Sequence, residues 1–515
     1  MKRFFTLITA FVLCFNLYGQ NDTAYIHTFG GIQNDGCKQV QPTPDGGYIM
    51  IGTTSSFGAG NTDFYAIKTD SLCNFKWSKC YGGPLNEEGF SVTTTLDKGY
   101  AFVGFTNSYG AGGYDVFLVK TDSMGNQKWQ KTYGGSNWDF GYSIQQLKDS
   151  GYVICGLTYS YGSVNGSMYI IRTDKMGDTL WTRTVGDSDY TIGNALHVLN
   201  DSIYLIAGGT TSFGIGDTNA CVVKIKDCHD SCHILSTWVY GRQQNSTFNS
   251  IRGTADTGCI MYGSNDSING SIVANAYQYE YLSKIDTSGV MKWAQLLSNL
   301  CTAPGIGEDA VQLSDGSILA LSSNASFGAG GFDFIIQRIS SDGSWIQSIS
   351  AGGPKDELAG SIAIGKNGDL VFAGSSDSYP LFSYGLFDVF MIRLKTTTNL
   401  PPNTNDTVVY RFRDTTKWSA SITLLHQSNV GVSVFPNPVN TSTTILVQGN
   451  DFIKYTFNLF NITGQAVISD YPFKNIGHGQ AVASLQRGGL CAGEYVYEIL
   501  SNGDTKVASG KLIIE

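Results

Sequence analysis

The sequence predicts an all-β protein built around a seven-bladed β-propeller. Three observations lead to this fold class: the composition, a unit that repeats seven times, and complementary half-units at the two ends of the repeats. Of 515 residues, 62 are glycine and 12% are aromatic, whereas only 15% are charged. This balance favours many short strands joined by tight turns over helical bundles, coiled coils or disordered acidic chains. The formal charge of −9 also argues against a nucleic-acid partner, which requires a basic surface.

One unit recurs along the middle of the chain, mostly at intervals of 52 residues. Equivalent strand openings lie at Tyr48, Tyr100, Tyr152, Tyr204, Cys259, Ile318 and Leu370. A second register lies at Tyr25, Trp77, Trp129, Trp181, Trp238, Trp293 and Trp345. Because the two independent registers give the same count, we expect seven units.

Each unit is predicted to contain four strands. In the second unit these span residues 89–96, 99–106, 114–120 and 127–133, which are rich in β-branched and aromatic residues and bounded by turn residues. Four strands in about 50 residues are typical of a propeller blade, whereas the coils of a parallel β-helix are shorter. The last unit lacks its tryptophan strand. Residues 24–31 supply such a strand, so we expect the N-terminal strand to complete blade seven.

The chain begins with a pattern typical of a cleaved export signal. Residues 1–3 are basic, residues 4–17 are largely apolar, and Gly19 is a small residue suited to a cut, so we assign residues 1–19 to a signal peptide. Lipoprotein processing at Cys14 is a less favoured alternative, because no small residue directly precedes this cysteine. We expect no transmembrane segment, since no later stretch approaches 18 consecutive apolar residues.

The remaining chain divides into three parts that differ in composition and residue pattern. Residues 20–398 contain the repeats, and residues 399–430 are predicted to form a polar, proline-bearing linker. Residues 431–515 show short alternating strands separated by Asn-Pro, Thr-Gly and Asn-Gly turns. This pattern predicts a small C-terminal β-sandwich.

The C-terminal part carries ordered motifs. Their main residues are Pro436, Asn437, Pro438, Gly464, Gly493, Tyr495 and Lys511. Through these motifs residues 431–515 resemble the type A C-terminal sorting domain of the type IX secretion system, found on secreted proteins of Bacteroidetes; Cys491 departs from the family pattern. The resemblance implies that the secretion machinery is a partner, that the protein crosses the outer membrane, and that this domain is removed before surface attachment. Residues 24–395 are also similar to the seven-bladed β-propeller repeat family, a likeness that concerns fold and not function.

Two long loops of each unit are expected to share one face, which is our candidate binding surface. Repeated aromatic residues in one of these loops are Phe57, Tyr109, Tyr161, Phe213 and Phe327. These side chains could form a ring that binds a glycan or a peptide, or they could pack between blades.

Charged residues repeat as well. Candidate ligand-binding acids at the start of the third strand are Asp63, Asp115, Asp333 and Asp388. Acids in the other long loop are Asp35, Glu87, Asp139 and Glu357. Together they could bind calcium, or they could cap turn amides, which we favour because no loop has a dense calcium-binding spacing; we therefore expect no cofactor. The repeated bases Lys68, Lys120, Arg172, Lys224, Lys284, Arg338 and Arg393 are expected to pair with carboxylates or to cover the tryptophans.

A longer spacing before Trp238 contains two cysteines and two histidines. An oxidising compartment favours a hairpin disulfide between Cys228 and Cys232, with a metal site or free thiols as alternatives. We predict no metal site.

The sequence contains no motif of a known catalytic class, so we do not expect an enzyme. It predicts a secreted, surface-displayed propeller that acts as an adhesion or recognition scaffold for a glycan or a protein. One alternative is a polysaccharide hydrolase or lyase with its site in the central pocket, which blade-specific acids at the channel mouth would favour. The other is a purely structural surface protein.

Overall fold

The computed structural model describes residues 23–514 with several gaps. The gaps are residues 187–188, 215–217, 241–244, 266–278, 298–304, 326–329, 379–385, 396–405, 412–422, 427–430, 436–441, 449–454, 462–465, 478–479, 488–489, 491–492 and 502–504. All regular elements in the described residues are strands. Among these residues no helix is long and apolar enough to cross a membrane. The expected signal peptide, residues 1–19, lies outside the described residues.

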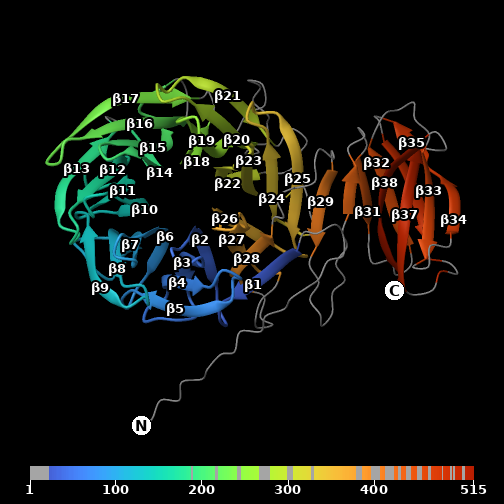
Figure 1. Ribbon diagram of the computed structural model, residues 1–515, viewed down its shortest axis with the longest axis horizontal. Helices are drawn as coiled ribbons and strands as arrows, with labels where there is room; N and C mark the ends of the chain where they lie inside the picture. Colours follow the sequence, from blue (N-terminus) through green and yellow to red (C-terminus); the bar gives the residue numbers. More distant parts are fainter. Residues whose placement is uncertain are drawn as a thin grey trace, which may run out of the picture.

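Seven four-stranded antiparallel blades surround a common centre, as predicted (Figure 1). Blade one contains β2 (Asp35–Pro42), β3 (Tyr48–Thr54), β4 (Asp63–Thr69) and β5 (Phe75–Tyr81). Blade two contains β6 (Glu87–Thr94), β7 (Tyr100–Thr106), β8 (Asp115–Thr121) and β9 (Gln127–Tyr133). Blade three contains β10 (Asp139–Gln146), β11 (Tyr152–Thr158), β12 (Ser167–Thr173) and β13 (Thr179–Val185). Blade four contains β14 (Thr191–Asn200), β15 (Ile203–Thr210), β16 (Asn219–Asp227) and β17 (Cys232–Tyr240).

The remaining blades follow the same order. Blade five contains β18 (Ser246–Gly253), β19 (Cys259–Asn265), β20 (Tyr279–Ile285) and β21 (Met291–Leu296). Blade six contains β22 (Gly305–Gln312), β23 (Ile318–Asn324), β24 (Asp333–Ile339) and β25 (Trp345–Gly352). Blade seven contains β26 (Glu357–Ile364), β27 (Leu370–Ser376), β28 (Asp388–Lys395) and, as its outer strand, β1 (Thr23–Phe29).

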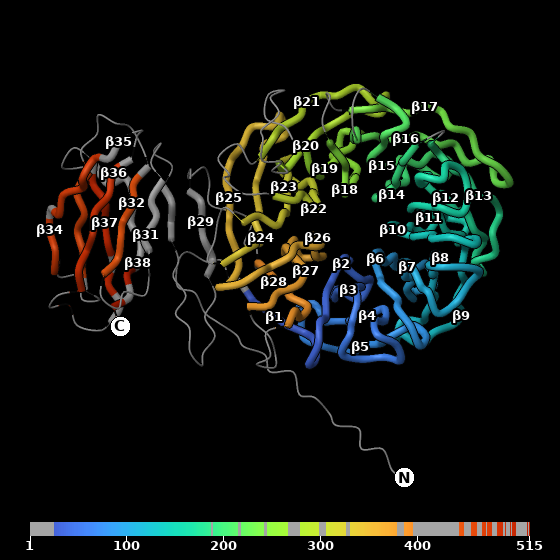
Figure 2. Tube along the Cα trace, turned by 180° about the vertical axis from the view of Figure 1, so that it is seen from behind, coloured from blue at the N-terminus to red at the C-terminus, as the bar shows by residue number. Residues whose placement is uncertain are grey.

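The predicted closure of the ring is confirmed. β1 pairs with β28 over its whole length, from Thr23 opposite Lys395 to Phe29 opposite Val389. The first strand of the chain thus ties the last blade to the first, which leaves no open edge between them. In Figure 2 the ring is seen from behind, with the outer strands β5, β9, β13, β17, β21 and β25 along its rim.

The core lies between neighbouring blades. The second and third strands of blades two and three (β7, β8, β11 and β12) are buried at every residue. One cluster combines Ile51 and Phe64 of blade one with Phe102 and Phe117 of blade two, and the Phe64 and Phe117 rings meet edge to face at 5.1 Å. Because each blade buries its faces against its neighbours, the middle strands must be apolar throughout.

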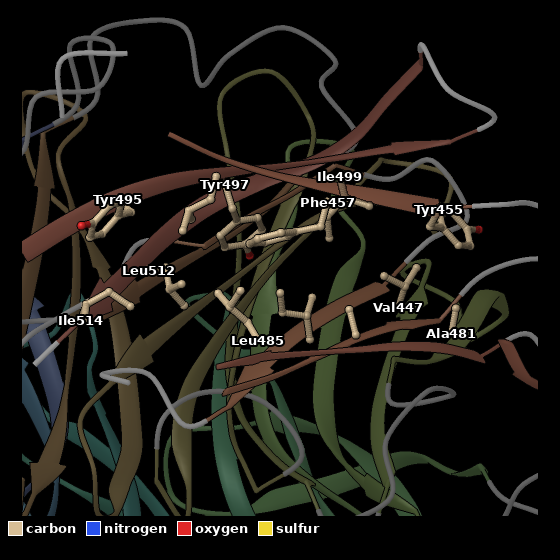
Figure 3. Packing of buried hydrophobic residues seen from close by; sticks show 13 residues of the cluster. Val447, Tyr455, Phe457, Ala481, Leu485, Tyr495, Tyr497, Ile499, Leu512 and Ile514 are labelled. Atoms are coloured by element: carbon tan, nitrogen blue, oxygen red, sulfur yellow. The ribbon is translucent and has the colours of Figure 1, made fainter. Parts of the chain in front are cut away.

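The C-terminal part is a sandwich of two sheets, as predicted. One sheet contains β31 (Gly431–Phe435), β32 (Ser442–Gln448), β36 (Gln480–Gln486) and β35 (Lys474–Gly477). The other contains β38 (Thr505–Ile514), β37 (Gly493–Ser501), β33 (Tyr455–Asn461) and β34 (Ala466–Pro472). Figure 3 shows the core between them, where Val447 and Leu485 of the first sheet face Phe457, Tyr497 and Leu512 of the second.

Three residues of the expected sorting motif can be placed on strands of the sandwich. Tyr495 is buried in the core and pairs with Leu512; Gly493 pairs with Ile514, and Lys511 with Val496. Pro436, Asn437, Pro438 and Gly464 lie outside the described residues.

The segment expected to be a linker contains two short strands. β29 (Asp406–Arg411) pairs in parallel with β25 of blade six, and β30 (Thr423–His426) pairs with β38 of the sandwich.

Candidate functional site

The repeated tryptophans and tyrosines form contacts between blades. Tyr81 of blade one donates a hydrogen bond from its hydroxyl to the Gly125 carbonyl of blade two at 2.7 Å. A Cβ on Gly125 would lie 2.8 Å from the Trp77 indole, so only glycine lets the turn pack this closely against the ring. Tyr133 repeats the contact with the Gly177 carbonyl at 2.7 Å. These side chains therefore pack neighbouring blades against each other.

The expected aromatic ring also packs within the protein. Tyr109 and Tyr161 donate hydrogen bonds to the carbonyls of Gly82 and Gly134, at 3.1 and 2.8 Å. Their rings pack on the third strand of their own blades, as does the ring of Phe57, each with centroids 5.7 Å from the neighbouring ring. Tyr109 and Tyr161 keep 37% and 44% of their surface exposed. A ligand-binding role for this set stays a prediction.

Of the other two members of that set, only Phe213 lies within the described residues. Phe213 is half-buried against the cluster of blades three and four. Phe327 lies outside the described residues. Direct contacts therefore support the alternative in which these aromatic side chains pack within the protein.

The two sets of repeated acids meet in pairs at blade interfaces. A Cβ on Gly82 would lie 2.2 Å from Asp63 Oδ1 and 2.3 Å from Glu87 Oε2, so both carboxylates border one small space. Asp63 Oδ2 accepts hydrogen bonds from Ala59 N and Gly60 N at 2.9 and 3.0 Å, and Glu87 Oε2 accepts one from Gly83 N at 2.7 Å. The same arrangement joins Asp115 to Asp139, Asp388 to Asp35, and Asp333 to Glu357.

Burial dominates the electrostatics of these pairs. It raises the pKa of Asp63 and Asp115, and it raises the pKa of Glu357 to about 7. Oδ1 of Asp115 and Oδ1 of Asp139 are buried without a hydrogen-bond partner. Within the described residues no three metal-binding side chains cluster, and calcium takes six to eight oxygens. The arrangement caps turn amides, the alternative that the sequence favoured, and a ligand-binding role of these acids stays a prediction.

The repeated bases behave as expected. Six form ion pairs with a carboxylate in the first turn of their own blade: Lys68–Asp45, Lys120–Asp97, Arg172–Asp149, Lys284–Asp256, Arg338–Asp315 and Arg393–Asp369. Lys224 instead lies over the Trp238 ring, with Nζ 5.8 Å from its centroid.

The cysteine-histidine segment forms the β16–β17 hairpin of blade four. Cys228 and Cys232 are both free thiols in this structure, so the expected disulfide is not formed there. In this hairpin Cys232 pairs with Asp227, and Cys228 lies one residue further into the turn. Asp227 closes the interface to blade three, accepting hydrogen bonds from Arg172 Nε at 2.9 Å and Trp181 Nε1 at 3.0 Å.

The inner strands of all seven blades line a central cavity of about 980 Å³. Each inner strand has a β-bulge at the same register position, where one residue has no partner on the second strand. The bulge residues are Lys38, Phe90, Tyr142, Asn194, Asn249, Glu308 and Gly360, and all seven line the cavity. We call them the bulge ring. Since bulges redirect side chains and are over-represented next to active sites, this ring is the candidate functional site.

In several blades the residue after the bulge instead holds the wall together. Gln39 Oε1 accepts a hydrogen bond from Val92 N of blade two at 2.7 Å. Ser91 and Ser143 accept hydrogen bonds from the next blade in the same way, at 3.3 and 3.2 Å. These contacts stiffen the scaffold on which the bulge ring stands.

The cavity carries charges of both signs. Lys38 Nζ lies 5.9 Å from the centroid of the Phe90 ring. Arg252 pairs with Asp309 through two hydrogen bonds, of 3.0 Å and 2.5 Å. Burial raises the pKa of Glu308 to about 7, against the opposing effect of Lys38. Burial also lowers the pKa of His197, and Arg252 acts in the same direction.

Sequence reasoning missed the bulge ring, although a signal was present. Every bulge residue lies ten positions before the strand opening of its unit, and in that column the seven units carry Lys, Phe, Tyr, Asn, Asn, Glu and Gly. A variable column within a strongly repeated pattern marks a position that packing does not dictate.

One comparison concerns the C-terminal sandwich. Its last 83 residues match the family described as secretion system C-terminal sorting domain, over residues 433–515. Residues 433–515 are a secretion sorting domain. This tail indicates secretion to the cell surface or outer membrane, with the type IX machinery as the partner. No curated protein matches the chain.

Several solved structures resemble the propeller at low identity. The WD40 domain of Neurospora crassa Pan2 is 10% identical, with a TM-score of 0.41 over 69% of this chain and 88% of that one. The propeller domain of the Trilobed protease from Pyrococcus furiosus is 9% identical, with a TM-score of 0.40 over 73% and 98%. Puromycin hydrolase is 11% identical, with a TM-score of 0.41 over 80% and 58%. Likenesses of this level bring no function to the chain.

Proposed function

We propose that this protein is exported through the type IX secretion system and displayed at the cell surface, where its propeller acts as an adhesion or recognition scaffold. The ligand binds in the central cavity, against the bulge ring. One observation carries this proposal. The seven bulge positions have the same register in the cavity wall, yet they carry six kinds of residue. If these residues served only the fold, equivalent positions would not require different residue types.

Export is supported from both ends of the chain. The sorting domain lies at residues 433–515, and the sequence of residues 1–19 has the pattern of a cleaved signal peptide. Both segments are expected to be absent from the mature protein, which would leave the propeller as its working part.

An enzyme that acts on polysaccharide is the second candidate, and Glu308 is the observation that favours it. This glutamate lies in the cavity with a pKa raised to about 7, which suits a general acid near neutral pH. Its carboxyl group would need a second acid or base at a defined distance, and the neighbouring Asp309 is engaged by Arg252.

The export part is tested by the intact mass of the protein recovered from the surface and the medium of the producing bacterium. We expect loss of residues 1–19 and of the C-terminal domain, and a heavy adduct on the new C-terminus of surface material. A chain ending at residue 430 should remain in the periplasm. Surface delivery of this shortened chain would overturn the sorting role.

The binding part is tested with the mature protein on printed arrays of glycans and of peptides. Lys38→Ala and Glu308→Gln should each weaken binding at least tenfold, whereas Leu96→Ala, at an exposed turn residue that does not line the cavity, should not. Absence of binding on both arrays would leave a structural role. Cleavage of a bound glycan that Glu308→Gln abolishes would establish the enzyme.

A further inference from the structure

We infer that the ligand is a neutral carbohydrate chain, which stacks its sugar rings on the exposed members of an aromatic path that leads from the cavity to the β9–β10 loop, between blades two and three. This inference rests on the proposed function and names its ligand class. It depends on six aromatic side chains that the repeated packing contacts do not use.

The path is continuous. Phe90 meets Tyr142 with ring centroids 5.2 Å apart, and Tyr142 stacks on Phe140 at 6.1 Å. From Phe140 the path continues through Phe105 at 5.0 Å and from there to Tyr114, again at 5.0 Å. Each ring is therefore in van der Waals reach of the next.

Both ends of the path are open. Phe90 and Tyr142 line the cavity. At the other end Trp138 contacts Tyr114 with centroids 6.0 Å apart, and 55% of the tryptophan is exposed. A large indole left half exposed to water in this loop is costly for packing alone, and it offers a face to a ligand.

The aromatic path belongs to two blades only. In the column of Trp138 the other units carry Asn34, Asn86, Tyr190, Asn245, Pro304 and Asp356. In the column of Phe140 they carry Gly36, Glu88, Ile192, Thr247, Ile306 and Leu358. Since the blades fold with or without these rings, their presence here is not explained by the blade architecture.

The chemistry of the site fits a sugar. A pyranose presents a flat face of C–H groups that packs on aromatic rings, and a rim of hydroxyls that hydrogen-bond to polar side chains. Around the cavity the bulge ring supplies such partners in Lys38 and Glu308. The cations Lys38 and Arg252 balance the acids Glu308 and Asp309, so the lining favours neither a polyanion nor a polycation.

A peptide fits this wall less well. An extended peptide binds by adding a strand to a free sheet edge, where it pairs with a regular row of backbone groups. Each inner strand is interrupted by its bulge, as between Gly89 and Ser91 in β6, and so lacks such a regular row. The aromatic rings of Phe90 and Tyr142 in the cavity, and of Trp138 at the exposed end of the path, remain available to sugar rings.

Titration calorimetry of the mature propeller tests the inference with five named probes. These are cellohexaose, xylohexaose, chitohexaose, a hyaluronan hexasaccharide and decaproline. We expect at least one of the three neutral oligosaccharides to bind, with Trp138→Ala and Tyr142→Ala each weakening it tenfold or more. Tyr142→Phe keeps the ring and should change the affinity less than threefold, and Leu96→Ala should not change it. Unchanged melting temperatures show that each variant is folded.

Each other outcome overturns the inference in a recognisable way. Binding of decaproline or hyaluronan alone, lost in Lys38→Ala, would leave the proposed function standing and exclude a neutral glycan. Glycan binding that survives Trp138→Ala and Tyr142→Ala would exclude the aromatic path. No binding by any probe would count against both the inference and the proposed function.

Discussion

Residues at the blade interfaces repeat from blade to blade, whereas residues of the bulge ring differ, although both sets belong to the same blades. At the interfaces the same contact recurs, as in the hydrogen bonds from Tyr81 to Gly125 and from Tyr133 to Gly177, both 2.7 Å long. In the bulge ring a lysine, a glutamate and aromatic rings occupy equivalent positions. Residues that repeat therefore hold the blades together, and residues that vary do not take part in these contacts. Four predictions test this division.

The largest effect is expected where two backbones touch. In Gly156→Ala the new Cβ would lie 1.8 Å from the Phe140 carbonyl oxygen, which is backbone of the paired inner strand and cannot rotate away. We expect a loss of about 3 kcal/mol in the free energy of unfolding. Urea denaturation followed by tryptophan fluorescence measures this loss.

Gly209→Ala is the matched control, because its Cβ meets only side-chain atoms, at 3.1 Å or more. Equal urea midpoints for the two variants would contradict the close approach of β10 and β11.

The next effect concerns a buried acid pair. Because burial raises the pKa of Glu357 to about 7, the folded protein binds a proton here more tightly than the unfolded chain. This contribution to stability is complete below about pH 4.5 and is lost as the pH rises through 7. Glutamine does not ionise, so Glu357→Gln avoids this loss of stability. At pH 8 the variant should therefore be more stable than the wild type by about 1–3 kcal/mol.

Thermal unfolding between pH 5 and pH 8 checks this prediction. The two proteins should converge at pH 5, and Asp230→Asn, at an exposed carboxylate, should leave the profile unchanged. A wild-type profile that rises towards pH 8 would show that the pair is stabilised as a dianion.

A smaller effect is expected from one interface hydroxyl. Tyr133→Phe keeps the ring but leaves the buried Gly177 carbonyl without its donor, which should cost about 1 kcal/mol. Tyr161→Phe removes a similar hydrogen bond, of 2.8 Å to Gly134, at a site open to water, and should cost less. If both variants lose the same stability in urea, burial does not distinguish the two sites.

The smallest effect on stability is expected in the bulge ring. Lys38 is exposed to the cavity, and Lys38→Ala should change the free energy of unfolding by no more than about 0.5 kcal/mol. The same variant should lose ligand binding. A stability loss comparable to that of Tyr133→Phe would mean that the ring serves the fold and would remove the basis of the comparison.

Much of the architecture was predictable from the repeat. The spacing from Tyr48 to Tyr100 and onward gave seven blades, and the N-terminal strand at Tyr25 gave the closure that β1 and β28 form. In blade two the predicted inner strand, residues 89–96, is β6 (Glu87–Thr94) in the structure. The shift arises because the strand bulges at Phe90, and a bulge breaks the period-two alternation on which strand prediction depends.

The candidate site was less predictable, because its contacts join residues of different blades. The acids Asp115 and Asp139 were visible as repeated residues, but their pairing at Gly134 depends on how blade three docks on blade two. Phe140 is an ordinary strand aromatic in the sequence, and Trp138 is an aromatic residue of the preceding loop. Only the packing of blades two and three connects them to Phe90 through Phe105 and Tyr142.

The sequence by itself determined the number of blades, the closure of the ring and the sorting tail, because each is encoded in local patterns repeated or ordered along the chain. Only the tertiary structure decided which side chains face the cavity. That choice depends on one extra residue in each inner strand, which turns Lys38, Tyr142 and Glu308 towards the axis. The physical reason is that a bulge is stabilised by the pairing and twist of a whole blade, and these contacts have no counterpart in the linear order of residues.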